Sequence, residues 1–156
     1  MTRKDPGRIL CDSRWICIQM EQHMNRCLSS GGITAVQAQI LLYLLEHSDQ
    51  GTSLTTLHRE FRYSMATLSG MLKRLKEKGY IRMERCDGDD RYKLLYVTEK
   101  GRKIQDFLKQ TTVSVQNQLY GCLSPEELDT LYGLQKKILH HITILTDQRQ
   151  KEATTS

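Results

Sequence analysis

The sequence predicts a mainly helical protein with one small β-hairpin and about six helices. Only two prolines, Pro6 and Pro125, occur in the 156 residues, so the interval between them can form long helices without interruption. Apolar residues follow helical spacing through most of the chain and change to a two-residue alternation between Tyr80 and Val97. The first observation favours helices, and the second indicates a single pair of strands.

The length suits one domain of ordinary size, because a chain of this length buries roughly 70% of its unfolded surface without help from disulfides. The longest apolar run, residues 40–45, is far shorter than the roughly 20 residues that a membrane span needs. Charged residues occupy the N-terminal segment, where a secretory signal would need an apolar stretch. We therefore expect a cytoplasmic protein that does not enter a membrane.

The cysteines and histidines do not have metal-ligand spacing. There are five cysteines, an odd number, and no two of them have the two-residue separation of a zinc knuckle or a redox dithiol. The sequence also lacks a recognisable nucleophile-base pair, phosphate loop or metal cluster. We expect neither a metal, nor a cofactor, nor enzymatic activity.

The positive charge is concentrated in one segment. Lys and Arg exceed Asp and Glu by 23 to 18, a net charge of +5. Between Arg59 and Lys93 there are ten basic residues against six acidic ones, so most of the excess lies in under a quarter of the chain. This charge allows a phosphate-bearing partner and directs the search for function to that segment.

Two helices are expected before this basic segment. The first carries an apolar stripe with no hydrophobic neighbour in sequence and ends at the break over residues 29–32. Thr34 and Gln37 form a capping box that opens the second helix, which residues 49–51 stop. The stripe of the first helix is made of Ile9, Ile16, Met20, Met24 and Cys27.

Two more helices are expected inside the basic segment. Ser53 can cap a short helix over residues 54–61, and Ser64 can cap a helix that continues to about Lys78 and stops at Gly79. The core face of the latter helix is expected to be Leu68, Met71, Leu72 and Leu75. The nearby basic residues Lys76, Lys78, Arg82 and Arg85 are expected to be solvated surface charges.

Two strands and two helices complete the pattern. Strands are expected over residues 80–86 and 92–97, joined by a charged tip over 87–91. The tip lacks the alternating acids of a calcium loop. Thr98 then caps a long fifth helix, Ser124 and Pro125 begin a sixth, and a polar tail follows from Gln148.

Helix, tight turn, second helix and charged hairpin together make the winged helix-turn-helix arrangement. A helix fits the major groove of DNA, and its first turn offers free N–H groups to phosphate oxygens. On the wing, Arg91 is long enough to enter a minor groove. Small residues on the exposed face of the fourth helix allow close approach, and two basic residues lie one turn further along. The expected DNA-binding residues on this helix are Ser64, Ala66, Thr67, Ser69, Gly70, Lys73 and Arg74.

The segment over residues 89–101 resembles the wing signature of the multiple-antibiotic-resistance regulator (MarR) family of bacterial transcription factors. The family pattern is Asp, one residue, Arg, three residues, an aliphatic, one residue, an aliphatic, Thr, two residues and Gly. This chain meets every position, from Asp89 and Arg91 to Thr98 and Gly101. Residues 64–81 are similar to the family's recognition helix and first wing strand.

The resemblance implies a homodimer that binds a pseudopalindromic double-stranded operator, most often as a repressor. Residues 1–32 and 103–147 would form a helical dimerisation lobe, residues 33–102 the winged helix-turn-helix domain, and residues 148–156 a polar tail. The apolar stripes of the terminal helices also favour a homodimer, because a winged-helix core of about 70 residues does not need them. In the family, Asp89 would pair with Arg91 and fix its direction.

The resemblance also implies that a ligand or an oxidant releases the DNA. Small aromatic or phenolic compounds are the usual effectors, and Arg14, Trp15 and Tyr43 are candidate pocket walls. Cys11 lies near the start of the first helix, where one branch of the family senses peroxides. The neighbouring Arg8 and Arg14 could activate the thiol. The alternative is that Cys11 is an inert thiol.

A winged-helix module that binds another protein is the alternative function. In that class the exposed helix face would carry aromatic or aliphatic anchors. Here it carries small polar residues with Lys73 and Arg74, which favours DNA.

Overall fold

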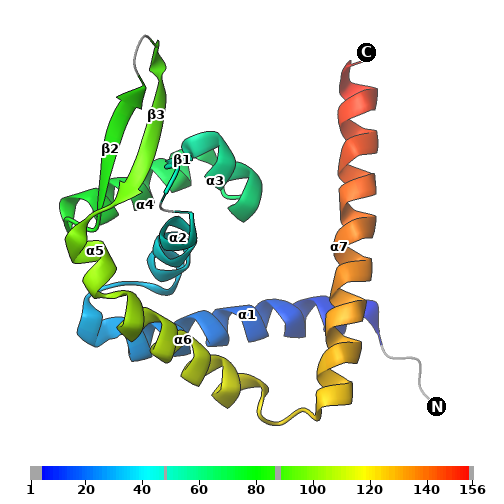
Figure 1. Cartoon of the computed structure of the whole chain (residues 1–156). Helices are drawn as coiled ribbons and strands as arrows, with labels where there is room; N and C mark the ends of the chain where they lie inside the picture. Colours follow the sequence, from blue (N-terminus) through cyan, green and yellow to red (C-terminus); the bar gives the residue numbers. More distant parts are fainter. Residues whose placement is uncertain (1–4, 48, 87–88, 155–156) are drawn as a thin grey trace. The chain divides into compact units, whose positions relative to one another are not determined.

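The structure is a computed structural model that describes residues 5–47, 49–86 and 89–154. The chain forms two compact units, Met1–Val115 and Gln116–Ser156. The mainly helical prediction is confirmed (Figure 1). The elements in order are α1 (Pro6–Leu28), the 3-10 turn η1 (Ser29–Gly31), α2 (Ala35–Glu46), β1 (Thr52–Ser53), α3 (Leu54–Phe61), α4 (Met65–Glu77), β2 (Ile81–Cys86), β3 (Asp89–Val97), α5 (Glu99–Lys103), α6 (Gln105–Tyr120) and α7 (Pro125–Thr154).

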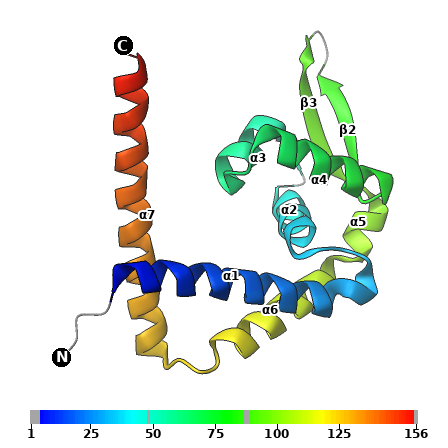
Figure 2. The ribbon, with the colours of Figure 1, turned by 180° about the vertical axis from the view of Figure 1, so that it is seen from behind.

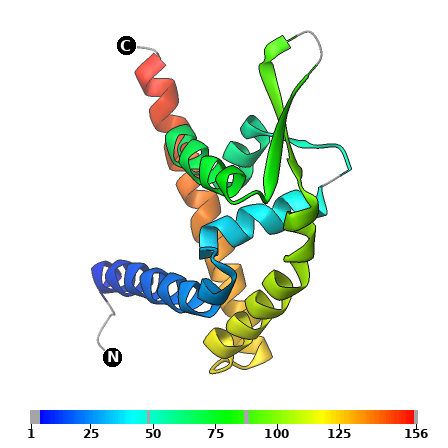
Figure 3. The same ribbon diagram turned by 90° about the vertical axis from the view of Figure 1, so that its left-hand side faces the viewer.

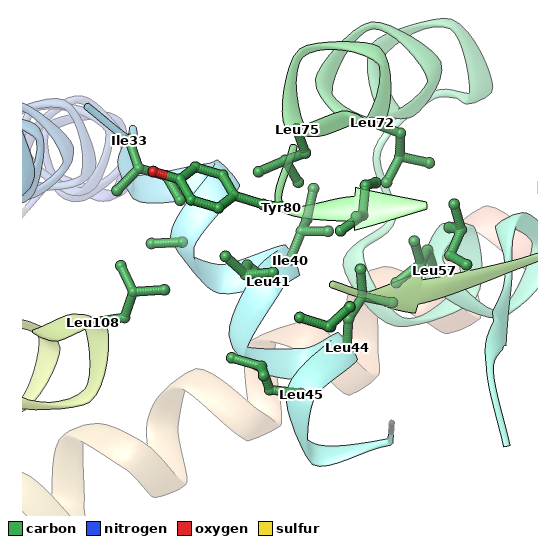
Figure 4. Close-up of a cluster of buried hydrophobic side chains, with 14 of the residues drawn as sticks. Ile33, Ile40, Leu41, Leu44, Leu45, Leu57, Leu72, Leu75, Tyr80 and Leu108 are labelled. Carbon is green, nitrogen blue, oxygen red and sulfur yellow. The ribbon is translucent and has the colours of Figure 1, made fainter. Parts of the chain in front are cut away.

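Helix α2 is the centre of the core in the first unit. Its Ile40, Leu41 and Leu44 are at most 1% exposed. Leucines from α4 point toward this helix, and Leu57 of α3 joins them (Figure 4). Each such side chain contributes about 1.5–3 kcal/mol when fully buried. The core therefore fixes α3 and α4 on the helix beneath them.

The predicted helix starts are confirmed by their capping bonds. The Thr34 hydroxyl accepts from the N–H of Gln37 at 3.3 Å, and the Gln37 side chain accepts from the Thr34 N–H at the same distance. The Ser53 and Ser64 hydroxyls each accept from the N–H three residues later at 3.1 Å. Ser124 likewise caps α7. Local side-chain chemistry thus sets where these helices begin.

The hairpin belongs to a three-stranded antiparallel sheet of order β1-β3-β2. Ile81 lies opposite Val97 and Met83 opposite Leu95, as the alternating pattern predicts. The hairpin extends away from the helices of the first unit (Figures 1 and 3). The sequence missed β1, because two residues at the start of α3 are too few to show a period.

Three predicted boundaries are wrong. Strand β3 begins at Asp89, three residues earlier than expected. The fifth helix is two helices, α5 and α6, divided at Ile104, so the described residues form seven α-helices where about six were expected. Gly101 lowers helix propensity within α5 by about 1 kcal/mol. Helix α7 continues through the expected tail to Thr154, because residues 148–153 contain no glycine or proline to end it.

Among the described residues no single helix is long and apolar enough to cross a membrane. Only the pair made by residues 6–31 and α2 reaches that length and composition, across a bend of 69°, and α2 places its apolar side chains in the core.

Candidate nucleic-acid interface

Helix α4 has one face in the core and one face in solvent. Leu68, Leu72 and Leu75 are at most 3% exposed and pack toward α2. The helix lies beside α3 at the foot of the hairpin (Figure 2). The predicted DNA-binding residues of this helix, Ser64, Ala66, Thr67, Ser69, Gly70, Lys73 and Arg74, are all exposed. The fold therefore presents them together on one face.

The first turn of α4 is held rigidly and presents small groups. The Ser64 hydroxyl accepts from the Thr67 N–H at 3.1 Å and donates to the Thr67 hydroxyl oxygen at 2.8 Å. An anion in front of this turn would meet the positive end of a 13-residue helix.

Gly70 occupies the middle of the exposed face. A β-carbon at this position would have no atom of the described chain within 4 Å. Glycine inside a helix costs about 1 kcal/mol relative to alanine, so a helix that needed only stability would carry alanine here. The missing side chain leaves the backbone of α4 open to a close partner.

A groove of about 500 Å³ separates α4 from the hairpin. Its floor is apolar, formed in part by Leu72, Ile81 and Leu95. Lys73, Lys76, Arg82 and Lys93 line it as well, and their charges make the groove strongly basic. Arg82 is partly engaged, because it pairs with Glu84 and lies 4.7 Å from the centre of the Tyr96 ring. Nζ of Lys73 lies 4.0 Å from Oε1 of Glu77. This ion pair is exposed to solvent, so it contributes little to stability.

The wing residues are placed only by their backbone. Asp89 and Arg91 lie in the first part of β3, and Asp89 is opposite Cys86. Their side chains, and residues 87–88 of the expected tip, lie outside what the structure describes. The Asp89–Arg91 ion pair stays a prediction.

The turn before α4 holds a residue that sequence reasoning missed. Arg62 has a φ of 56°, the left-handed conformation that L-residues rarely adopt. It caps the C-terminus of α3, and its N–H donates to the His58 carbonyl oxygen at 2.9 Å. The sequence did not indicate this conformation, because glycine and asparagine, which usually adopt it, are absent from the turn. The exposed Arg62 adds a positive charge next to the start of the recognition face.

Beside this turn, Tyr63 has a pKa raised above its ordinary value. The main cause is partial burial, and the negative charge of Glu21 adds to it. Both effects disfavour the phenolate, so the neutral phenol of Tyr63 persists to higher pH than in an ordinary tyrosine.

The candidate sensor residues fall into two groups. Cys11, Arg14 and Trp15 are exposed on α1, within little more than one helical turn of each other. Tyr43 is half-buried on α2, where its ring stacks on His47 at 4.2 Å and meets Phe61 edge-on at 5.5 Å. The residues that line the pocket beside Tyr43 do not include Cys11, Arg14 or Trp15.

An exposed helix face of small and basic residues beside a β-hairpin defines a winged helix-turn-helix protein. Comparison with known families identifies the branch: the chain belongs to the family of transcriptional regulators SarA/Rot, whose family model matches residues 22–108, more than half of the chain.

Solved structures of regulators share this fold. The S. aureus MepR–DNA complex superposes with a TM-score of 0.80 at 23% identity, over 89% of this chain and 99% of that one. A mutant MarR from E. coli complexed with operator DNA gives 0.76 at 25% identity, over 85% and 92%. The transcriptional regulator SlyA gives 0.76 at 18% identity, over 86% and 93%. The predicted resemblance to MarR regulators is confirmed.

Proposed function

We propose that this chain is a homodimeric repressor that binds a pseudopalindromic operator through α4 and the wing, and that a small molecule or thiol oxidation releases it. The observation that carries this proposal is the exposed face of α4. Seven small or basic residues share that face, while its opposite side is fixed in the core by three leucines. Such a face suits the major groove.

The basic groove explains how helix and wing act together. When a helix lies in the major groove and a wing reaches the adjacent minor groove, the intervening phosphate strand passes between them. The groove between α4 and the hairpin is lined by four basic residues, which would suit it to that strand. We assign Lys73, Lys76, Arg82 and Lys93 to that phosphate strand, and Ser69 and Gly70 to the closest approach to the bases.

Dimerisation is inferred from apolar surface that a single chain leaves in water. On α7, Leu134, Ile138 and Ile142 are each about half exposed, and on α1 Ile9 and Leu10 are 56% and 73% exposed. An apolar surface of this kind marks an interface. A two-fold axis through these helices would present two recognition helices about 34 Å apart, one turn of DNA.

The proposed division of the chain follows from this inference. Residues 1–32 and 103–147 would clasp the second copy, and residues 33–102 would bind DNA. Release would require an effector to change the separation of the two recognition helices. Small aromatic or phenolic compounds are the proposed ligands, with Arg14, Trp15 and Tyr43 as candidate pocket walls and Cys11 as the candidate thiol.

The direct test is binding to DNA taken from immediately upstream of the protein's own gene, with random duplex as the control. We expect the upstream duplex to bind at least about 1,000-fold more tightly. We also expect a steep loss of affinity with salt, because several phosphate contacts release counterions. A monomer that binds both duplexes equally and weakly would contradict the proposal and favour a protein-interaction module.

A further inference from the structure

The ammonium group of Lys78, at the end of α4, is bound to the protein itself. Nζ donates to the Gly32 carbonyl oxygen at 2.5 Å and to Oε1 of Gln37 at 3.0 Å. Lys73 and Lys76 of the same helix are exposed, whereas Lys78 is half-buried. The expectation that Lys78 is a solvated surface charge is therefore wrong. Its partners lie 46 and 41 residues earlier in the chain, so no local pattern could reveal them.

Both acceptors of Lys78 are themselves fixed. Gln37 is 3% exposed, and its Oε1 also accepts from the Thr34 N–H at 3.3 Å in the capping box of α2. Gly32 ends the turn that joins α1 to α2, with a φ of 65°. Hydrogen bonds from a charged donor are roughly twice as strong as neutral ones. Lys78 thus ties the last turn of α4 to the junction between α1 and α2.

A second set of bonds holds the same turn from the side of α5. Lys100 donates to the Lys78 carbonyl oxygen at 2.7 Å, and its Nζ lies 5.1 Å from the centre of the Tyr80 ring. The Tyr80 hydroxyl donates to the Gly31 carbonyl oxygen at 3.3 Å, and the Thr98 hydroxyl donates to the Gly79 carbonyl oxygen at 2.5 Å. The C-terminal end of α4 is therefore bound on two sides.

We infer that Lys78 is a positioning residue for DNA reading and not a phosphate ligand. Leucine packing holds α4 on the core but has no directional preference, and it allows small rotations and shifts along the helix axis. The directed bonds from Lys78 oppose such shifts and so set the direction in which Ser69 and Lys73 point. This role rests on the proposed function, because it concerns the same α4 face.

The test compares Lys78→Met with Lys76→Met, a matched loss of one positive charge two residues away on the same helix. Lys78→Met should bind the upstream duplex about tenfold more weakly, because α4 must then be ordered during binding. The slope of log affinity against log salt concentration should stay at the wild-type value. Lys76→Met should reduce that slope by about 1, as loss of one phosphate contact does. Lys78→Arg keeps the charge and the donors and should recover most of the affinity.

A second measurement does not involve DNA. Amide hydrogen exchange at Lys78–Tyr80 and at Thr34–Gln37 should accelerate in Lys78→Met and remain unchanged in Lys76→Met. Normal affinity in Lys78→Met, or a salt slope reduced by about 1, would overturn the positioning role. If amide exchange in Lys78→Met is unchanged while the wild-type chain prefers the upstream duplex, the positioning role is overturned and the proposed function stands. Failure of the wild-type chain to prefer the upstream duplex would instead overturn the proposed function.

Discussion

Gly101 lies directly against the carbonyl oxygen of Tyr80. A β-carbon at position 101 would overlap that oxygen and would lie 2.5 Å from Cγ1 of Val97. The last glycine of the wing signature therefore has a structural cause: α5 approaches the backbone before β2 too closely for any side chain.

Replacing this glycine should destabilise the protein. Gly101→Ala forces α5 away from Tyr80, and overpacking of this kind costs about 1–3 kcal/mol. Urea unfolding followed by circular dichroism measures the free energy of unfolding. An unchanged midpoint would show that α5 moves without cost and that the close approach has no structural importance.

Gly70→Ala is the matched substitution with the opposite expected effect on stability. Its β-carbon meets nothing, and alanine is favoured over glycine in a helix interior by about 1 kcal/mol. We expect a higher free energy of unfolding together with weaker operator binding, because the added methyl group stands between the helix and the bases. Stabilisation with full DNA affinity would remove Gly70 from the interface.

Sequence reasoning succeeded where the cause of a structure is local. Ser53, Ser64 and Thr98 each cap a helix through a bond to an N–H three residues away, and a reader of the sequence sees both partners. The exposed face of α4 was likewise predictable, since the helical period separates Lys73 and Arg74 from the buried leucines.

It failed where a contact joins distant parts of the chain, or where no glycine, asparagine or proline stands at a turn or helix break. Lys78 looks like a surface lysine because Gly32 and Gln37 are remote in sequence. The break at Ile104 has no proline to mark it. Arg62 adopts the left-handed conformation although it is not glycine, asparagine or aspartate, the residue types that adopt it most readily. For Lys78 the cause is a tertiary contact, whereas Arg62 makes a local bond to the His58 carbonyl oxygen and the turn at Ile104 follows the low helix propensity of Gly101.

Arg91→Ala should weaken operator binding and leave the oligomeric state unchanged. The residue lies in the first part of β3, next to the end of the hairpin, where a long cation can reach a minor groove. Removal of one such contact should cost about 1–3 kcal/mol of binding. Fluorescence anisotropy measures the affinity, and Lys137→Ala on α7 controls for the lost charge. Equal affinities of the two variants would exclude the wing from recognition.

Ile138→Glu should dissociate the proposed dimer. Ile138 is 57% exposed in the single chain and shares a face of α7 with Ile142 and Leu145. An unpaired charge buried in an interface costs about 3–5 kcal/mol, which raises the dimer dissociation constant more than 100-fold. Sedimentation equilibrium gives that constant. His140→Glu places the same side chain on the polar side of α7 and should leave the dimer intact; equal effects of the two substitutions would count against an apolar interface.

Cys11→Ser distinguishes a redox sensor from an inert thiol. Cys11 is exposed on α1, and Arg8 precedes it and Arg14 follows it by about one helical turn, so an oxidant can reach the sulfur near positive charge. If this thiol is the sensor, peroxide should release the wild-type protein from operator DNA and should not release Cys11→Ser. Cys17→Ser and Cys122→Ser change two other exposed thiols and should release DNA as the wild type does. A Cys11→Ser protein that still responds would assign the oxidation elsewhere.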